Sequence, residues 1–72
     1  MDARKIDHIV TTIQALESQR RGIQNDIEFL VKEDEELKRQ GLLPRHEVSI
    51  RQKRSTICDI NRKIDGLNAQ LR

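Results

Sequence analysis

The 72-residue sequence contains a single aromatic residue, Phe29, and neither tryptophan nor tyrosine. Its one cysteine, Cys58, excludes an internal disulfide and cannot by itself make a zinc site, which needs about four ligands. We therefore expect no disulfide, no metal and no cofactor. A chain this short without such a staple usually depends on a partner chain for its stability.

Long apolar runs are also missing. No stretch approaches the ~18 apolar residues of a membrane span, and no apolar segment follows the basic pair Arg4 and Lys5, as it would in a secretory signal. Charged residues make up 36% of the chain and apolar residues 35%, with a formal charge of +2. These features predict a cytoplasmic protein that does not bind a membrane.

What the sequence does contain is a regular apolar spacing. The apolar residues recur at alternating steps of three and four, which is the a and d pattern of a heptad helix. Asp2 is suited to the N-cap position. We therefore predict one helix over about residues 2–40. Its a and d positions are Ile6, Ile9, Ile13, Leu16, Arg20, Ile23, Ile27, Leu30, Asp34 and Leu37.

A clear stop signal follows this helix. Gly41 is suited to the left-handed position of a Schellman ending, and Pro44 to the first position of a new helix. We therefore expect a turn at residues 41–43 and a second helix over about residues 44–71. Its a positions are Leu43, Ile50, Ile57, Ile64 and Leu71.

Together these elements predict a single all-α domain over residues 1–72, an antiparallel two-helix hairpin of the coiled-coil type. Folding at Gly41 brings Asp34 close to Lys53, and we expect these two charges to pair and to specify the register. The second helix then ends opposite residues 12–13, so we expect Ile6, Ile9 and Val10 to have no intrachain partner. Since each helix covers only part of the other's apolar stripe, we expect a homo-oligomer, with a dimer that forms a four-helix bundle favoured.

Two surfaces are predicted to contact a partner or a second copy. The first lies at the start of the first helix, where Ile6, Ile9, Val10 and Ile13 extend the heptads beyond the end of the second helix. The alternative is a frayed terminus. The second is the rear of helix 1, where small residues and the only aromatic recur at helical spacing, and the alternative is a chance run of small polar residues. This second set is Ala15, Ser18, Gly22, Asn25 and Phe29.

The second helix is basic. Residues 44–72 hold seven basic and three acidic side chains, whereas residues 1–43 hold seven basic and nine acidic ones. Arg51, Arg54, Arg62 and Lys63 are therefore candidates for contacts with nucleic-acid phosphates or another anion. The alternative is a solvated face that pairs with the acidic helix of a neighbour. No aromatic residues are interleaved for base stacking.

Catalysis has little basis in the sequence. The two histidines, His8 and His46, lie far apart along the chain, and Cys58 has no histidine beside it. A two-helix body does not enclose the cavity of about 300 Å³ that ligand sites usually need. We predict that the protein is not an enzyme.

The layout of two heptad helices, a short turn and a basic helical face resembles the Rop-type RNA-binding hairpin, which dimerises into a four-helix bundle. This resemblance implies RNA binding by a bundle, but no residue motif accompanies it and no site residue is carried over. The G-x-x-P turn from Gly41 to Pro44 is similar to that of small helical-hairpin chaperones of bacterial secretion systems.

The function we expect is that of a small adaptor or inhibitor, of the kind bacteria and phages encode, which docks an apolar helix face onto a partner protein. A Rop-like RNA- or DNA-binding hairpin that uses the basic face of helix 2 is the alternative. A third alternative is an oligomer that binds a small anionic ligand.

Overall fold

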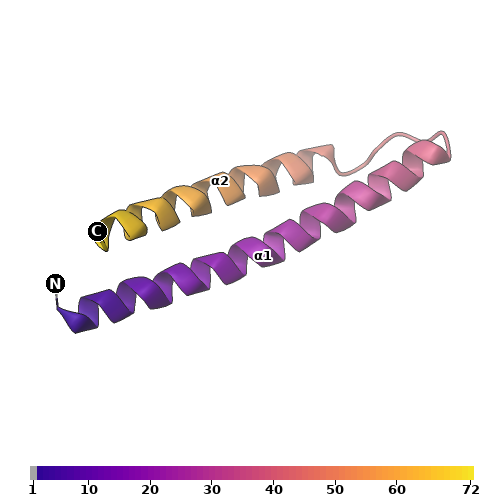
Figure 1. The fold of residues 1–72 in the computed structure, drawn as a ribbon. Helices are drawn as coiled ribbons and strands as arrows, with labels where there is room; N and C mark the ends of the chain where they lie inside the picture. Colours follow the sequence, from indigo (N-terminus) through magenta and orange to yellow (C-terminus); the bar gives the residue numbers. More distant parts are fainter. Residues whose placement is uncertain (1) are drawn as a thin grey trace.

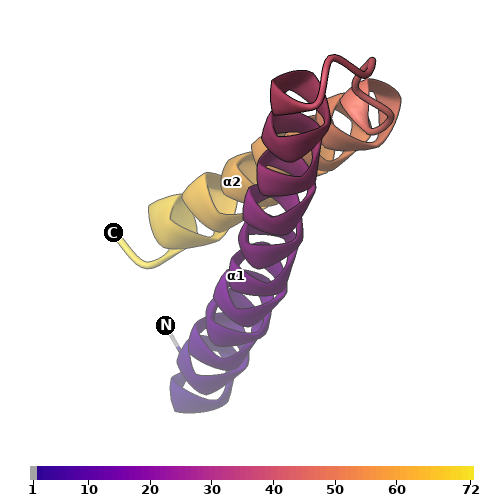
Figure 2. The ribbon, with the colours of Figure 1, turned by 90° about the vertical axis from the view of Figure 1, so that its right-hand side faces the viewer.

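Two antiparallel helices and the segment between them make up the computed structural model, which describes residues 2–72 (Figure 1). Helix α1 spans Ala3–Arg39 and α2 spans Glu47–Gln70, with no strand in the described part of the chain. The helices lie side by side in both views of the ribbon (Figures 1 and 2). The prediction of an all-α two-helix hairpin is thereby confirmed.

The hairpin is a thin rod. Its principal extents are 58 × 14 × 13 Å, and its radius of gyration is 17.0 Å, whereas a compact domain of this length has a radius of gyration of about 11 Å. Neither helix in residues 2–72 has an apolar stretch long enough to cross a membrane.

Both ends of α1 follow from local chemistry. Asp2 is the N-cap, and its Oδ1 accepts a hydrogen bond from the backbone N–H of Arg4 at 3.2 Å, as predicted. At the other end the N–H of Leu42 donates to the carbonyl of Leu37 at 2.8 Å, and the N–H of Gly41 donates to that of Lys38 at 3.0 Å. This pair of bonds is a Schellman ending, so the predicted helix stop is confirmed.

Gly41 permits this ending because it adopts a φ of +78°, which L side chains rarely do. We expect Gly41→Ala to lower the free energy of unfolding by about 1 kcal/mol. Gly66→Ala is the matched control, because it adds the same methyl group to open space within α2 and should raise stability by up to ~1 kcal/mol. Urea unfolding of the two variants checks the opposite signs, and equal signs would contradict this explanation.

The second helix begins later than the sequence predicts. It starts at Glu47 rather than at Pro44, and its N-cap, His46, makes no side-chain capping bond. The connecting segment is therefore longer than the expected turn at 41–43. Leu43, expected at a seam position, lies in this segment and is 85% exposed.

The carboxylate of Asp34 explains the longer connection. Its Oδ1 accepts the backbone N–H of Arg45 at 3.0 Å, and its Oδ2 accepts that of His46 at 3.2 Å. Only 6% of Asp34 is exposed. The predicted pairing of Asp34 with Lys53 is wrong, because Lys53 instead places its Nζ 3.6 Å from Oδ2 of Asp26. Asp34 thus fixes the register through the backbone of the connecting segment.

The longer connection also changes which residues of α1 are covered. Non-helical residues advance about 3.3 Å each against 1.5 Å in a helix, and the segment runs back along α1 before α2 starts (Figure 1). The start of α2 is therefore displaced towards the N-terminus of α1. The expectation that Ile9 lacks an intrachain partner is wrong, since Ile9 is only 7% exposed and belongs to the core.

The core lies in the half of the rod away from the connecting segment. Four isoleucines form it, and Leu16, Ile23 and Leu67 pack against them. Arg20, for which the heptad pattern gave no role, donates from Nη1 to Oδ1 of Asn61 at 2.7 Å and so joins the two helices beside this core. The four core isoleucines are Ile9, Ile13, Ile60 and Ile64.

Candidate interaction surfaces

The hairpin leaves much of its apolar surface uncovered. In the described chain five apolar residues are buried and seven large ones are exposed. The accessible surface is 5776 Å², whereas a compact monomer of this mass is expected to expose about 4,700 Å². The exposed large apolar residues are Ile6, Val10, Phe29, Leu42, Leu43, Val48 and Leu71.

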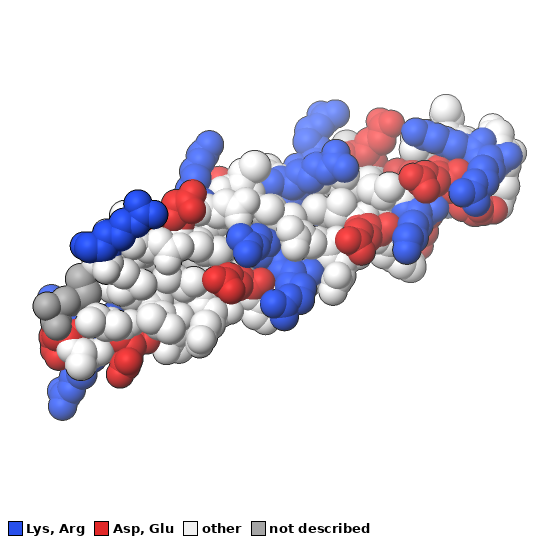
Figure 3. Space-filling model, viewed as in Figure 1, with Lys and Arg blue, Asp and Glu red and all other residues white. Residues whose placement is uncertain are grey.

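The predicted surface at the start of α1 is divided by the structure. Ile9 and Ile13 are buried inside the hairpin and are not available to a partner. Ile6 and Val10 are each 38% exposed, so they lie at the edge of the seam. Figure 3 shows a largely uncharged area over the first half of α1, with charged side chains at the end of α2 beside it. Here the candidate surface reduces to Ile6 and Val10.

The predicted surface on the rear of α1 is uncovered throughout. Ala15, Gly22 and Phe29 are all exposed, and Phe29 keeps 62% of its surface in contact with solvent. A Cβ atom built at Gly22 would meet nothing within 4 Å, so no part of the hairpin requires a glycine there. These residues therefore form a continuous strip on which another helix can pack closely.

A further apolar patch lies at the connecting segment, where Leu42, Leu43 and Val48 are exposed. The sequence pattern did not reveal it, because Leu43 continues the heptad spacing of α2 and was assigned to the seam. The informative residue is Asp34, whose carboxylate accepts the backbone N–H groups of Arg45 and His46 and so ties the connecting segment to α1.

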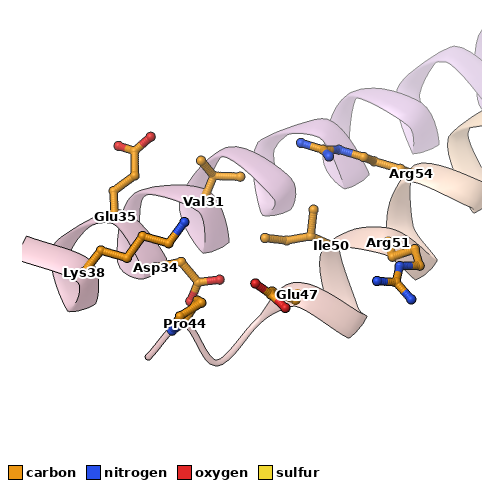
Figure 4. Close-up of a pocket in the computed structure, with 9 residues that line it drawn as sticks. All are labelled: Val31, Asp34, Glu35, Lys38, Pro44, Glu47, Ile50, Arg51 and Arg54. Atoms are coloured by element: carbon orange, nitrogen blue, oxygen red, sulfur yellow. The ribbon is translucent and has the colours of Figure 1, made fainter. Parts of the chain in front are cut away.

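Near the connecting segment an open hollow of about 500 Å³ lies between the two helices (Figure 4). Val31 and Ile50 form the apolar part of its lining, and Arg51 and Arg54 border it from α2. Acidic and basic side chains alternate around it. The remaining lining residues are Asp34, Glu35, Lys38, Pro44 and Glu47.

The four residues predicted to contact an anion are all exposed on α2: Arg51, Arg54, Arg62 and Lys63. Basic residues follow the edge of the molecule along this helix (Figure 3). Arg51 and Arg54 share the border of the hollow. Arg62 lies 4.0 Å from Asp59 of its own helix, and Lys63 stands on a different side of α2, because one residue turns the helix by about 100°. The structure therefore brings Arg51 and Arg54 together and leaves Lys63 apart.

The histidines and the cysteine lie apart. His46 Nε2 is 2.7 Å from Oε2 of Glu33, beside the connecting segment, whereas His8 lies near the start of α1 and Cys58 is exposed on α2. Within residues 2–72 no three histidine, cysteine, aspartate or glutamate side chains are grouped so that they could hold a metal ion.

Comparisons with protein-family models, with curated proteins and with solved structures found no match to this chain.

Proposed function

We propose that the hairpin is a non-catalytic, cytoplasmic protein-interaction module, an adaptor or inhibitor of bacterial or phage type. In this proposal two hairpins pack as a four-helix bundle, and the rear of α1, with Ala15, Gly22 and Phe29, docks onto a partner protein. The apolar surface that the isolated hairpin leaves exposed is the observation that carries the proposal.

The exposed surface of the hairpin supports an interaction role. The thin rod has about 1,100 Å² more total accessible surface than a compact monomer of its mass, and a standard interface covers about 800 Å² on each partner. Seven large apolar side chains contribute to that surface, and exposed apolar patches are typical of proteins that bind other proteins. The strip on the rear of α1 would remain exposed if a second hairpin covered the side of the molecule that carries the hollow. One hairpin can therefore make both contacts.

The test is a pull-down from an extract of the source cell with wild-type hairpin, Phe29→Asp and Gln52→Asp. We expect the wild type and Gln52→Asp to retain the same protein partner, because Gln52 is exposed on α2, away from the strip. Phe29→Asp should retain at least about tenfold less of it, since a charge is then buried in the apolar contact. If Phe29→Asp retains as much of the partner protein as the wild type does, docking through this strip is refuted.

Nucleic-acid binding is the second candidate, favoured by Arg51 and Arg54, which are exposed and make no ion pair within the described chain. Phosphate binding should weaken with salt by about one log–log unit for each contact, and apolar docking should not. Arg54→Glu combined with Arg62→Glu should abolish phosphate binding and leave docking through Phe29 intact. If the wild-type hairpin retains only nucleic acid in the pull-down, this second function is favoured.

A further inference from the structure

One flank of the hairpin, formed by the e and b positions of both helices, carries an apolar ridge and the hollow described above, whose lining includes Val31 and Ile50 among charged side chains, and we call it flank A. Val31 lines the hollow, and Val10 lies three heptads earlier in the same e position of α1, so both face the same side. Ile6, one turn from Val10, extends the ridge. Ridge and hollow are therefore about 32 Å apart along one helix.

The α1 part of flank A is symmetric about its middle. Val10 and Val31 are equally far from the point between Arg20 and Arg21. A second copy turned end for end about this point would place its Val10 over Val31 of the first, and its Ile6 beside the hollow. Both ends of the rod would make this contact, because a two-fold axis repeats each one.

The charges of α2 have the same symmetry. Its e and b positions on flank A include Glu47, Arg54, Asp65 and Arg72. Reversing the helix pairs Glu47 with Arg72 and Arg54 with Asp65, so that each pair joins opposite charges. None of these four residues makes an ion pair within the described chain, although all are exposed. The α2 part of flank A is thus complementary to itself in charge at these four positions.

The two symmetry centres coincide in the folded hairpin. The charge pairs of α2 are centred between Asp59 and Ile60, and the valines of α1 between Arg20 and Arg21. The hydrogen bond of 2.7 Å between Arg20 and Asn61 places these two centres at the same level of the rod. One two-fold axis therefore serves both helices, although their sequences are unrelated.

We propose that a second copy of this chain covers flank A, with the two connecting segments at opposite ends of the bundle. The excess surface of about 1,100 Å² is enough for the about 800 Å² that each member of a stable dimer buries. In this dimer the arginines of the two copies approach each other at the axis. Glu17 then lies one turn from Arg21 of the other copy and reduces the repulsion between these arginines. The inference rests on the proposed function and identifies one of its two partners.

The opposite orientation, with both connecting segments at one end, lacks this fit. In that arrangement α1 lies over α2 of the second copy, and Val10 faces the end of α2 between Asn68 and Arg72, where Leu71 is 38% exposed, instead of Val31. The hollow of each copy then faces the other hollow and has no apolar ridge to fill it. Apolar contact therefore selects the end-for-end dimer.

Disulfide formation tests the arrangement directly. In a Cys58→Ser background, Val10→Cys with Val31→Cys should give a covalent dimer under mild oxidation. The two positions are about 32 Å apart within one chain, so any disulfide between them joins two molecules. Val10→Cys alone is the matched control and should remain monomeric on a non-reducing gel. A monomer from the double variant, or a dimer from the single variant, would overturn the proposed geometry.

Charge exchange provides a second measurement that does not depend on cysteine. Arg54→Asp alone should raise the dimer dissociation constant about tenfold, because it sets one aspartate against Asp65 at each of the two ends. Adding Asp65→Arg should restore the wild-type constant. The two positions are too far apart within α2 to pair in one chain. No recovery in sedimentation equilibrium would refute this pairing, whereas the pull-down with Phe29→Asp tests the proposed function independently.

Discussion

Asp34→Ala is expected to lower the free energy of unfolding by about 3 kcal/mol. The buried carboxylate accepts the N–H groups of Arg45 and His46, and hydrogen bonds to a charged group each contribute about 1.5–3 kcal/mol. Their loss releases the connecting segment and the register of α2. Urea unfolding followed by circular dichroism measures the effect, and exchange of the amide protons of Arg45 and His46 should accelerate in the same variant.

Two further variants isolate the cause. Asp34→Asn keeps one acceptor oxygen, so we expect it to lose about half as much stability as Asp34→Ala. Asp26→Ala removes an exposed carboxylate of the same helix, 3.6 Å from Lys53, and should cost less than about 1 kcal/mol. If Asp34→Ala and Asp26→Ala have the same effect, Asp34 does not hold the connecting segment.

The second large effect is expected at Ile60, the most buried side chain of the core at 3% exposure. Ile60→Ala should cost about 3 kcal/mol through lost apolar burial and a residual cavity. A chain of this length has a total stability of about 4–11 kcal/mol, so the variant loses a large fraction of it. We expect the midpoint of thermal unfolding to fall by about 12–24 °C, as measured by circular dichroism.

Val48→Ala is the matched control for Ile60→Ala. Val48 lies on the same helix but is exposed, so its truncation should change stability by no more than about 0.5 kcal/mol. An Ile60→Ala variant as stable as Val48→Ala would mean that the isoleucine cluster is not the core of the folded molecule.

The helices and the end of α1 could be predicted because local patterns determine them. The heptad spacing sets the length of α1, Asp2 caps it, and Gly41 with Leu42 ends it through the Schellman bonds. Each of these signals lies within about six residues of the structure it specifies. Residue type and spacing were therefore sufficient.

The register could not be predicted, because it depends on a contact between residues far apart in the sequence. Asp34 resembles a polar seam residue, and Pro44 resembles a helix start, until the carboxylate is seen to bind the N–H groups of Arg45 and His46. The longer connecting segment changes the alignment of α2 with α1 along the whole hairpin. It buries Ile9, exposes Leu43 and leaves Ile6 with Val10 as the apolar ridge.

The candidate surfaces were predictable to a different extent on each side of α1. The rear strip with Phe29 depends only on helical periodicity, so the structure places it as the sequence indicated. The surface at the start of α1 and the grouping of the basic residues of α2 depend on how the helices are aligned. Only the structure shows that Arg51 and Arg54 border a hollow, lined by charged side chains together with Val31 and Ile50.

Sedimentation velocity of the wild-type hairpin tests the central claim most directly. We expect one species at micromolar concentration with twice the chain mass of 8.5 kDa, together with a thermal midpoint that rises as the protein is concentrated. A single 8.5 kDa species over the whole concentration range, with an unchanged midpoint, would contradict the claim that another chain completes this fold.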